Sequence, residues 1–261
     1  MYTLLIVDDE ELIRNAFPVY WHLRKAKLIK KVADMYRPKT VPYQEKDVSE
    51  KDILAPRIPA NLSVSDLSAG SFNEDDVISV CRAENSILED LSADNVSIQQ
   101  SVFDGCTFRR ISFHGLDVTD VRFVNCNLAN VDFGHAVLHR TVFSDCNLTG
   151  IDLREAVFRN VVFENCIARY SFLRSADMER TAFHSCRLEH ADFQQVKLAR
   201  TFFSQCDLTQ VQLSGTDLKG TDISTCNIDG LGVRIEDLAG AVVSPSQAVE
   251  LAKLMGIIVK M

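Results

Sequence analysis

Proline is missing from residues 60–244, although six prolines stand outside that stretch. A proline within a β-ladder removes a backbone N–H donor, so this absence indicates a long region in which those donors are needed. Apolar runs near the roughly 18 residues that span a membrane are also missing. The opening MYTLLIVDDEE has no basic region or cleavage site of a secretory signal. We therefore expect a cytosolic protein.

What the chain has instead is a period of five residues. From Phe103 to Ile228 every fifth residue is apolar, and these 26 positions include eleven Phe and ten Leu. Two residues before each of them stands a second inward residue, which is nearly always small or β-branched, and the other three positions are mainly polar. Five fits neither the helical period of 3.6 nor the strand period of 2.0. It predicts minimal strands with two inward residues, each followed by a turn.

A second period of twenty indicates how these short strands stack. Four five-residue units bring the chain back to the same side, so equivalent inward residues should form columns with a spacing of roughly 4.8 Å. We name the sides from the cysteine column: the Cys side, the second side, the third side and the fourth side. The Cys side carries Cys106, Cys126, Cys146, Cys166, Cys186, Cys206 and Cys226. The fourth side carries Phe103, Phe123, Phe143, Phe163, Phe183 and Phe203.

This pattern resembles the pentapeptide-repeat family, whose repeat is A(D/N)LXX with a central Leu or Phe. Segments that match it directly are CNLAN (126–130), CNLTG (146–150), ADMER (176–180), ADFQQ (191–195), CDLTQ (206–210) and TDLKG (216–220). The resemblance implies an all-β fold, the right-handed quadrilateral β-helix of that family. We expect the β-helix over residues 60–240, irregular at its start and most regular over 101–230.

Both ends need other structure, because a solenoid exposes two strand edges. At the carboxyl end, residues 241–261 predict a cap: a helix with Ser244 as N-cap and Pro245 in its first turn, then a strand at 257–259. Its apolar residues resemble the cap through which quinolone-resistance pentapeptide proteins dimerise, which implies a homodimer. The cap residues are Val249, Leu251, Leu254 and Ile257.

Residues 1–59 predict a small α/β extension ending in a linker. The stretch LLIVDDEELIRNAF resembles the start of a response-regulator receiver, with Asp8 and Asp9 in the place of its magnesium ligands. No apolar strand ends in a phosphorylatable aspartate near Asp47, so we do not expect a working receiver. The linker is expected over KTVPYQEKDVSEKD.

Catalysis is not predicted. Stacked thiols about 4.8 Å apart are too distant for a disulfide and do not converge on a metal. The histidines of the repeat are expected on its outside, away from the inward cysteines, and there is no glycine-rich phosphate loop. They are His114, His135, His139, His184 and His190. We expect no enzyme, cofactor or metal site.

Function should therefore reside on the outer surface. The family includes proteins that bind DNA gyrase and topoisomerase IV by imitating duplex DNA, so the resemblance implies a type II topoisomerase as partner. Residues 101–230 carry thirteen basic and sixteen acidic side chains, a net charge of −3. Duplex DNA of the same length, about 31 Å, carries roughly 18 negative charges. The charge thus disfavours a DNA mimic.

The alternative is a scaffold that binds an unknown protein partner, without direct contact with nucleic acid or a membrane. Apolar residues on the outside mark candidate contact surfaces. On the fourth side, the outward position carries Val142, Val162 and Phe202, among others, and this stripe would dock the N-terminal segment or a partner. A second candidate patch is Tyr170 with Phe172, beside the small Ala168.

Overall fold

The computed structural model describes residues 49–67, 73–254 and 256–259. By its contacts the chain divides into two units, Met1–Asp47 and Val48–Met261, and all described residues belong to the second. The expected receiver-like segment with Asp8 and Asp9 therefore lies outside the described residues.

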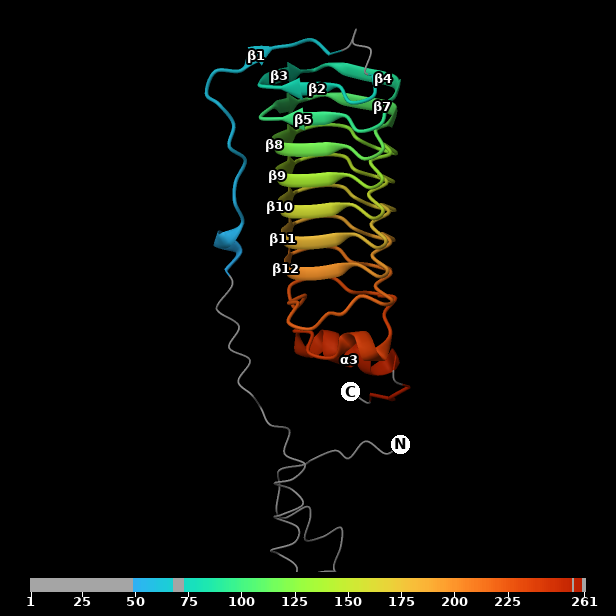
Figure 1. The fold of residues 1–261 in the computed structure, drawn as a ribbon. Helices are drawn as coiled ribbons and strands as arrows, with labels where there is room; N and C mark the ends of the chain where they lie inside the picture. The colour runs from blue at the N-terminus through green and yellow to red at the C-terminus, as the bar shows by residue number, and fades with distance from the viewer. Residues whose placement is uncertain (1–48, 68–72, 255, 260–261) are drawn as a thin grey trace, which may run out of the picture. The chain divides into compact units, whose positions relative to one another are not determined.

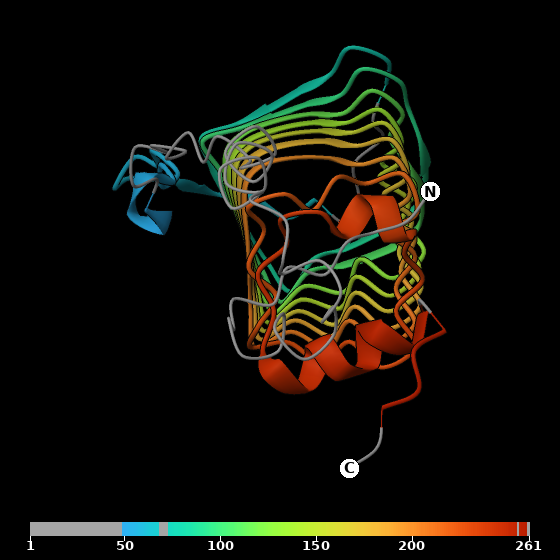
Figure 2. The ribbon, with the colours of Figure 1, turned by 90° about the horizontal axis from the view of Figure 1, so that it is seen from below.

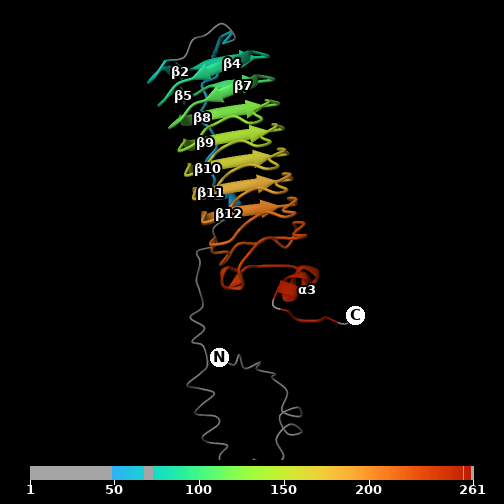
Figure 3. The same ribbon diagram turned by 90° about the vertical axis from the view of Figure 1, so that its right-hand side faces the viewer.

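The second unit is a rod of stacked coils that is four-sided when seen along its axis (Figure 1, Figure 2). Its strands are parallel throughout and follow one another up the rod (Figure 3). The fold is the quadrilateral β-helix of the pentapeptide-repeat type. Its elements are η1 Glu50–Asp52, β1 Ser63–Val64, β2 Val77–Ser79, β3 Cys81–Glu84, β4 Ile87–Ser92, β5 Ser97–Gln99, β6 Val102–Asp104, β7 Thr107–Ser112, β8 Asp117–Val124, β9 Val137–Ser144, β10 Val157–Glu164, β11 Asp177–His184, β12 Lys197–Ser204, η2 Ile235–Leu238 and α3 Pro245–Leu254.

The register confirms the twenty-residue repeat. Phe123 of β8 pairs with Phe143 of β9, and Phe143 pairs with Phe163 of β10. On the Cys side and the second side, β4 and β7 form a ladder in the early coils, and from β7 onward the pairing is reduced to isolated bridges such as Asn127 with Asn147. The first coil is irregular, as expected, because Ser63 of β1 pairs with Cys81 only eighteen residues later (81 − 63).

From Asp75 to Gly220 each corner of the coil is formed by a residue with positive φ, at positions whose numbers end in 0 or 5. Gly150 (φ 68°) adopts this conformation at no steric cost, and Asn160 (φ 60°) tolerates it better than most residues. Arg140 (φ 48°) shows that larger side chains also occur there. The corners point side chains outward, so they set the chemistry of the edges of the rod.

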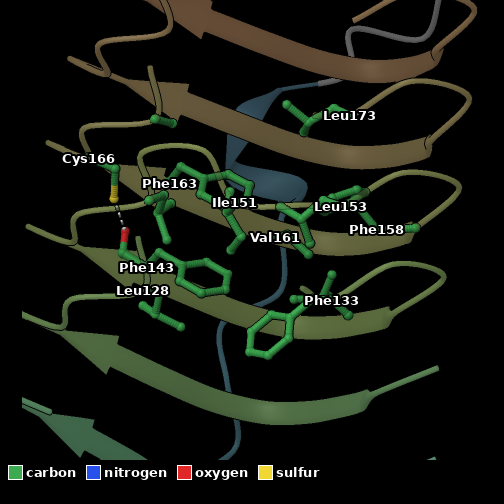
Figure 4. Packing of buried hydrophobic residues seen from close by; sticks show 14 of the residues in the cluster. Leu128, Phe133, Phe143, Ile151, Leu153, Phe158, Val161, Phe163, Cys166 and Leu173 are labelled. Atoms are coloured by element: carbon green, nitrogen blue, oxygen red, sulfur yellow. Dashed lines mark hydrogen bonds between the residues drawn. The ribbon is translucent and has the colours of Figure 1, made fainter. Parts of the chain in front are cut away.

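The core consists of the predicted columns. Rings of the Phe column stack with centroid separations of 4.9 Å between Phe143 and Phe163 and 4.7 Å between Phe163 and Phe183. The thiols of the Cys column are buried and free, and the six Sγ atoms from Cys106 to Cys206 each lie within hydrogen-bond distance of a carbonyl oxygen in the coil before. Cys166 Sγ, for example, lies 3.4 Å from Phe143 O (Figure 4). A small side chain that can also donate suits this position.

The carboxyl end is closed by α3. Ser244 Oγ accepts from Gln247 N at 3.3 Å, and Gln247 Oε1 accepts from Ser244 N at 2.7 Å, which together form a capping box. The Gln247 amide Nε2 also donates to Ile223 O and Cys226 O, both at 2.8 Å. Buried Gln247 thus satisfies carbonyl oxygens that have no further coil to pair with, a role that the sequence did not reveal.

The prediction of a strand at residues 257–259 is wrong. These three residues are exposed and form no ladder with any described residue. A strand needs a neighbour for its backbone hydrogen bonds, and none of the described residues provides one there. Of the predicted cap residues, Val249 and Leu251 are half-buried, whereas Leu254 and Ile257 are about half exposed, at 47% and 50%.

Candidate functional site

A segment before the first coil lies along the outside of the rod (Figure 1). We call residues 49–60 the strap. Near its start the short helix η1 contacts β11, and Glu50 Oε1 lies 2.5 Å from His184 Nε2. Further along, Leu54 N donates to Asn160 Oδ1 at 3.1 Å and Arg57 N donates to Asp120 Oδ1 at 2.8 Å. The linker expected over residues 39–52 therefore ends in a capped helix at 49–52, held against the rod.

The strap crosses the fourth side, whose outward stripe is the first candidate surface. His184 lies near one end of that side, while Asn160 and Asp120 are corner residues at its other end. The outward Ala182 is completely buried, and Val142, Val162 and Phe202 are half-buried. On the strap, four apolar residues are half-buried: Ile53, Pro56, Ile58 and Pro59.

Asp120 is the most constrained group under the strap. Arg140 donates to it through Nε and through Nη2, the latter at 2.7 Å, and Arg57 N shares the same carboxylate. The Arg140 hydrogen bonds lower the pKa of Asp120 below its usual value, with a smaller contribution from the Arg57 N–H, and outweigh the opposing effect of burial. The carboxylate stays ionised and keeps its acceptor capacity for the strap.

The second candidate surface is an exposed patch in one coil. We define the aromatic patch as Ile167, Tyr170 and Phe172, which are 38%, 48% and 46% exposed. The Tyr170 ring stacks on His190 with a centroid separation of 4.7 Å, and the Arg169 guanidinium lies 5.5 Å from the Tyr170 centroid. Sequence reasoning identified Tyr170 and Phe172 but missed Ile167, although Ile167 stands in an outward column that is polar in the adjacent coils.

The interior of the same coil holds unusually small residues. Ala168 stands where the coils on either side have Leu148 and Leu188, and Ser171 stands among Val and Ile. A small cavity lies at this level, lined by Leu148, Leu188, Ala168 and Ser171 among others. This coil therefore has less apolar volume inside and more outside than its neighbours.

Several acidic groups on the rod are paired with arginines. Asp120 pairs with Arg140, and Asp152 with Arg154. Glu189, nearly buried, lies between Arg169 and Arg187, with nitrogen–oxygen distances of 3.4 and 3.0 Å. Such pairing weakens further the small negative field that the net charge predicts.

Groups for chemistry do not converge in the part of the chain that the structure describes. His114 and His135 lie close, with ring centroids 4.7 Å apart, as their spacing predicts. Hydrogen bonds with Cys126 and Cys166, together with burial, raise the pKa of the Cys146 thiol and keep it protonated. Within residues 49–67, 73–254 and 256–259, no cluster of three His, Cys, Asp or Glu is placed to bind a metal, and no helix is long and apolar enough to cross a membrane.

Comparisons with known proteins agree with the repeat. Residues 116–193 match the model of a pentapeptide repeat region, and residues 186–224 match a model of eight pentapeptide repeats. No curated protein matches the chain.

The chain is similar to solved structures of three proteins: QnrB1, HetL and Rfr23. A variant of QnrB1, a plasmid-mediated fluoroquinolone resistance protein, is 19% identical over 76% of this chain and 98% of its own, with a TM-score of 0.38. HetL, a pentapeptide repeat protein involved in heterocyst differentiation regulation from the cyanobacterium Nostoc, is 12% identical over 65% and 90%, with a TM-score of 0.25. Rfr23 from the cyanobacterium Cyanothece is 15% identical over 62% and 91%, with a TM-score of 0.26.

Proposed function

Because the chain belongs to the pentapeptide-repeat family, we propose that it is a non-catalytic interaction protein whose rod binds a protein partner through the aromatic patch. The observation that carries this proposal is the position of Ile167, Tyr170 and Phe172. Their equivalents in the coils before and after are Asn147 and Arg187, Gly150 and His190, and Asp152 and Asp192. Three outward columns that hold polar residues or glycine in the adjacent coils thus become apolar in one coil.

The fold itself gives no reason for this arrangement. Apolar groups stabilise the rod when they fill its interior, yet this coil has Ala168 and Ser171 inside and exposes its large side chains. Exposed aromatic residues flanked by arginines are typical of the central residues of protein interfaces. Surrounding charges, such as Arg169 with Glu189, provide a polar rim.

The test uses substitutions that the columns themselves supply. Tyr170→Asn and Phe172→Asp introduce residue types found in the same columns at Asn130 and Asp152, so the fold should persist. Val137→Asp is the matched control, because Val137 is also exposed (41%) and Asp117 and Asp177 occupy its column. Proteins captured by the unchanged chain from a cell extract should be lost with the patch variant and kept with the control. Equal capture by the unchanged chain, the patch variant and the control would refute the aromatic patch as the binding surface.

A type II topoisomerase is the specific partner to test first, because the carboxyl end resembles that of quinolone-resistance pentapeptide proteins. DNA gyrase supercoiling should be measured with increasing protein, with and without a fluoroquinolone. Inhibition or drug protection that disappears with salt would support DNA mimicry. An effect that survives salt but is lost with the patch variant would support contact through the aromatic patch. No effect would exclude gyrase and leave a scaffold with another partner.

We also propose that the protein is a homodimer joined through its cap. Leu254, Ile257 and Ile258 are exposed at the end of the rod, and residues 257–259 have backbone groups without a ladder partner in this chain. Sedimentation equilibrium should give the mass of two chains, and Ile258→Lys should give one. A single-chain mass for the unchanged protein would overturn the dimer.

A further inference from the structure

The strap matches the repeat of the rod. Leu54 and Arg57 are three residues apart, which is roughly 10 Å of extended chain, and their acceptors Asn160 and Asp120 are two coils apart, also roughly 10 Å. Arg140 stands between the two acceptors in the same corner column, so a side chain that only donates separates two that accept. The two backbone donors of the strap are therefore spaced like their two acceptors on the rod.

Side chains accompany these hydrogen bonds. Ile53 and Ile58 of the strap are half-buried, as are Val142 and Val162 of the outward stripe on the fourth side. At the start of the strap, Glu50 Oε1 lies 2.5 Å from His184 Nε2. Two backbone donors and one side-chain contact thus join the strap to the rod, as in the recognition of an extended peptide.

The strap is nevertheless a separate layer. The coils of the rod pair by continuous ladders, whereas residues 54 and 57 are bonded to side-chain oxygens, and only β1 joins the ladder after the strap. A segment with few hydrogen bonds and half-exposed residues opens at lower free energy than the core to which it is attached.

We propose that the fourth side is a binding track for an extended peptide, that the strap occupies this track within the same chain, and that a partner segment with the chemistry of the strap takes its place. Such a segment has an acidic residue first, then apolar residues three and eight positions later, like Glu50, Ile53 and Ile58. The strap therefore blocks this side until it is displaced. This site is independent of the aromatic patch, which lies on the Cys side and the second side.

The experiment uses the full chain and a labelled synthetic peptide of residues 49–60 as the probe. The double variant Ile53→Asp/Ile58→Asp weakens the strap and leaves the track intact. Fluorescence anisotropy should show the peptide binding to this variant at least about tenfold more tightly than to the unchanged chain, in which the strap competes. Absence of binding to the double variant would overturn the proposal.

A further pair of substitutions tests where the peptide binds. Asn160→Arg, added to the double variant, removes the Leu54 acceptor and introduces the residue type of Arg140 and Arg180 in the same column. Asn130→Arg is the matched control, because Arg110 stands in its own column at a corner that the strap does not bond. Peptide affinity should fall at least about tenfold with Asn160→Arg and stay unchanged with Asn130→Arg. An equal change in peptide affinity for Asn160→Arg and Asn130→Arg would overturn the proposed track. Self-association of the double variant through its uncovered fourth side, measured by light scattering, would also overturn it.

Discussion

Replacing Thr181 with valine should stabilise the rod. Thr181 is inward and fully buried, and its Oγ1 has no hydrogen-bond partner in the structure. A buried hydroxyl without a partner costs about 1–3 kcal/mol. Valine has nearly the same shape, and Val161 already occupies the same column one coil earlier. We expect the free energy of unfolding to rise by about 1 kcal/mol.

Thermal and urea unfolding, followed by circular dichroism, measure this change. A gain of about 1 kcal/mol corresponds to a rise in Tm of about 2–4 °C for a domain of this size. Thr141→Val is the control, since Thr141 is equally buried in the same column but its Oγ1 lies 3.4 Å from His139 O. Because the Thr141 hydroxyl has an acceptor, its removal should raise the Tm and the free energy of unfolding little or not at all.

The comparison between the two variants decides the outcome. If Thr181→Val lowers the Tm, or raises it no more than Thr141→Val does, the Thr181 hydroxyl is not an uncompensated buried group. Thr201 offers a repeat of the measurement, because its Oγ1 is also buried without a partner.

Other predictions concern the core, the cap and the strap. The eight buried thiols should not react with Ellman's reagent until denaturant unfolds the rod; rapid labelling of the native protein would contradict their burial. Phe143→Ala should lower stability by about 3–5 kcal/mol in urea unfolding, because it opens a gap in the ring stack; a loss below 1 kcal/mol would show that the stack relaxes. Gln247→Leu should cost about 1–3 kcal/mol by the same assay, since two carbonyl oxygens lose their donor; no loss would mean that water replaces the amide. Because the folded pKa of Asp120 is lowered, its contribution is complete above the usual aspartate pKa and is lost as the pH falls through the folded value. Exchange of the Arg57 amide, corrected for its intrinsic rate, should therefore quicken only below about pH 4; quickening between pH 5 and 7 would implicate another group.

The periodic part of the molecule could be predicted because the inward residues recur at a fixed spacing along the chain. An apolar residue every fifth position and a cysteine every twentieth require four sides and a register of twenty residues, and the pairing of Phe123 with Phe143 follows directly. The N-cap at Ser244 follows from local backbone chemistry in the same way. The strand expected at 257–259 failed because apolar sequence alone cannot provide a pairing partner.

The candidate sites depend on departures from the period. Tyr170 and Phe172 could be found from the sequence because they interrupt polar columns, whereas their neighbours Arg169 and His190 required the structure to show the stacking. Gln247 has nothing in its local sequence to indicate that its amide reaches two carbonyl oxygens more than twenty residues away.

The sequence by itself determined the coil, its four sides and its buried columns, because those contacts recur at a fixed separation along the chain. Only the tertiary structure decided that residues 49–60 lie on the fourth side. That placement rests on hydrogen bonds between residues 63 and 106 positions apart, from backbone donors that every non-proline residue carries. Because nearly all residues carry this donor, the sequence does not show which N–H groups bind Asp120 and Asn160. These acceptors can be assigned only once the folded rod places them at the spacing of the strap donors.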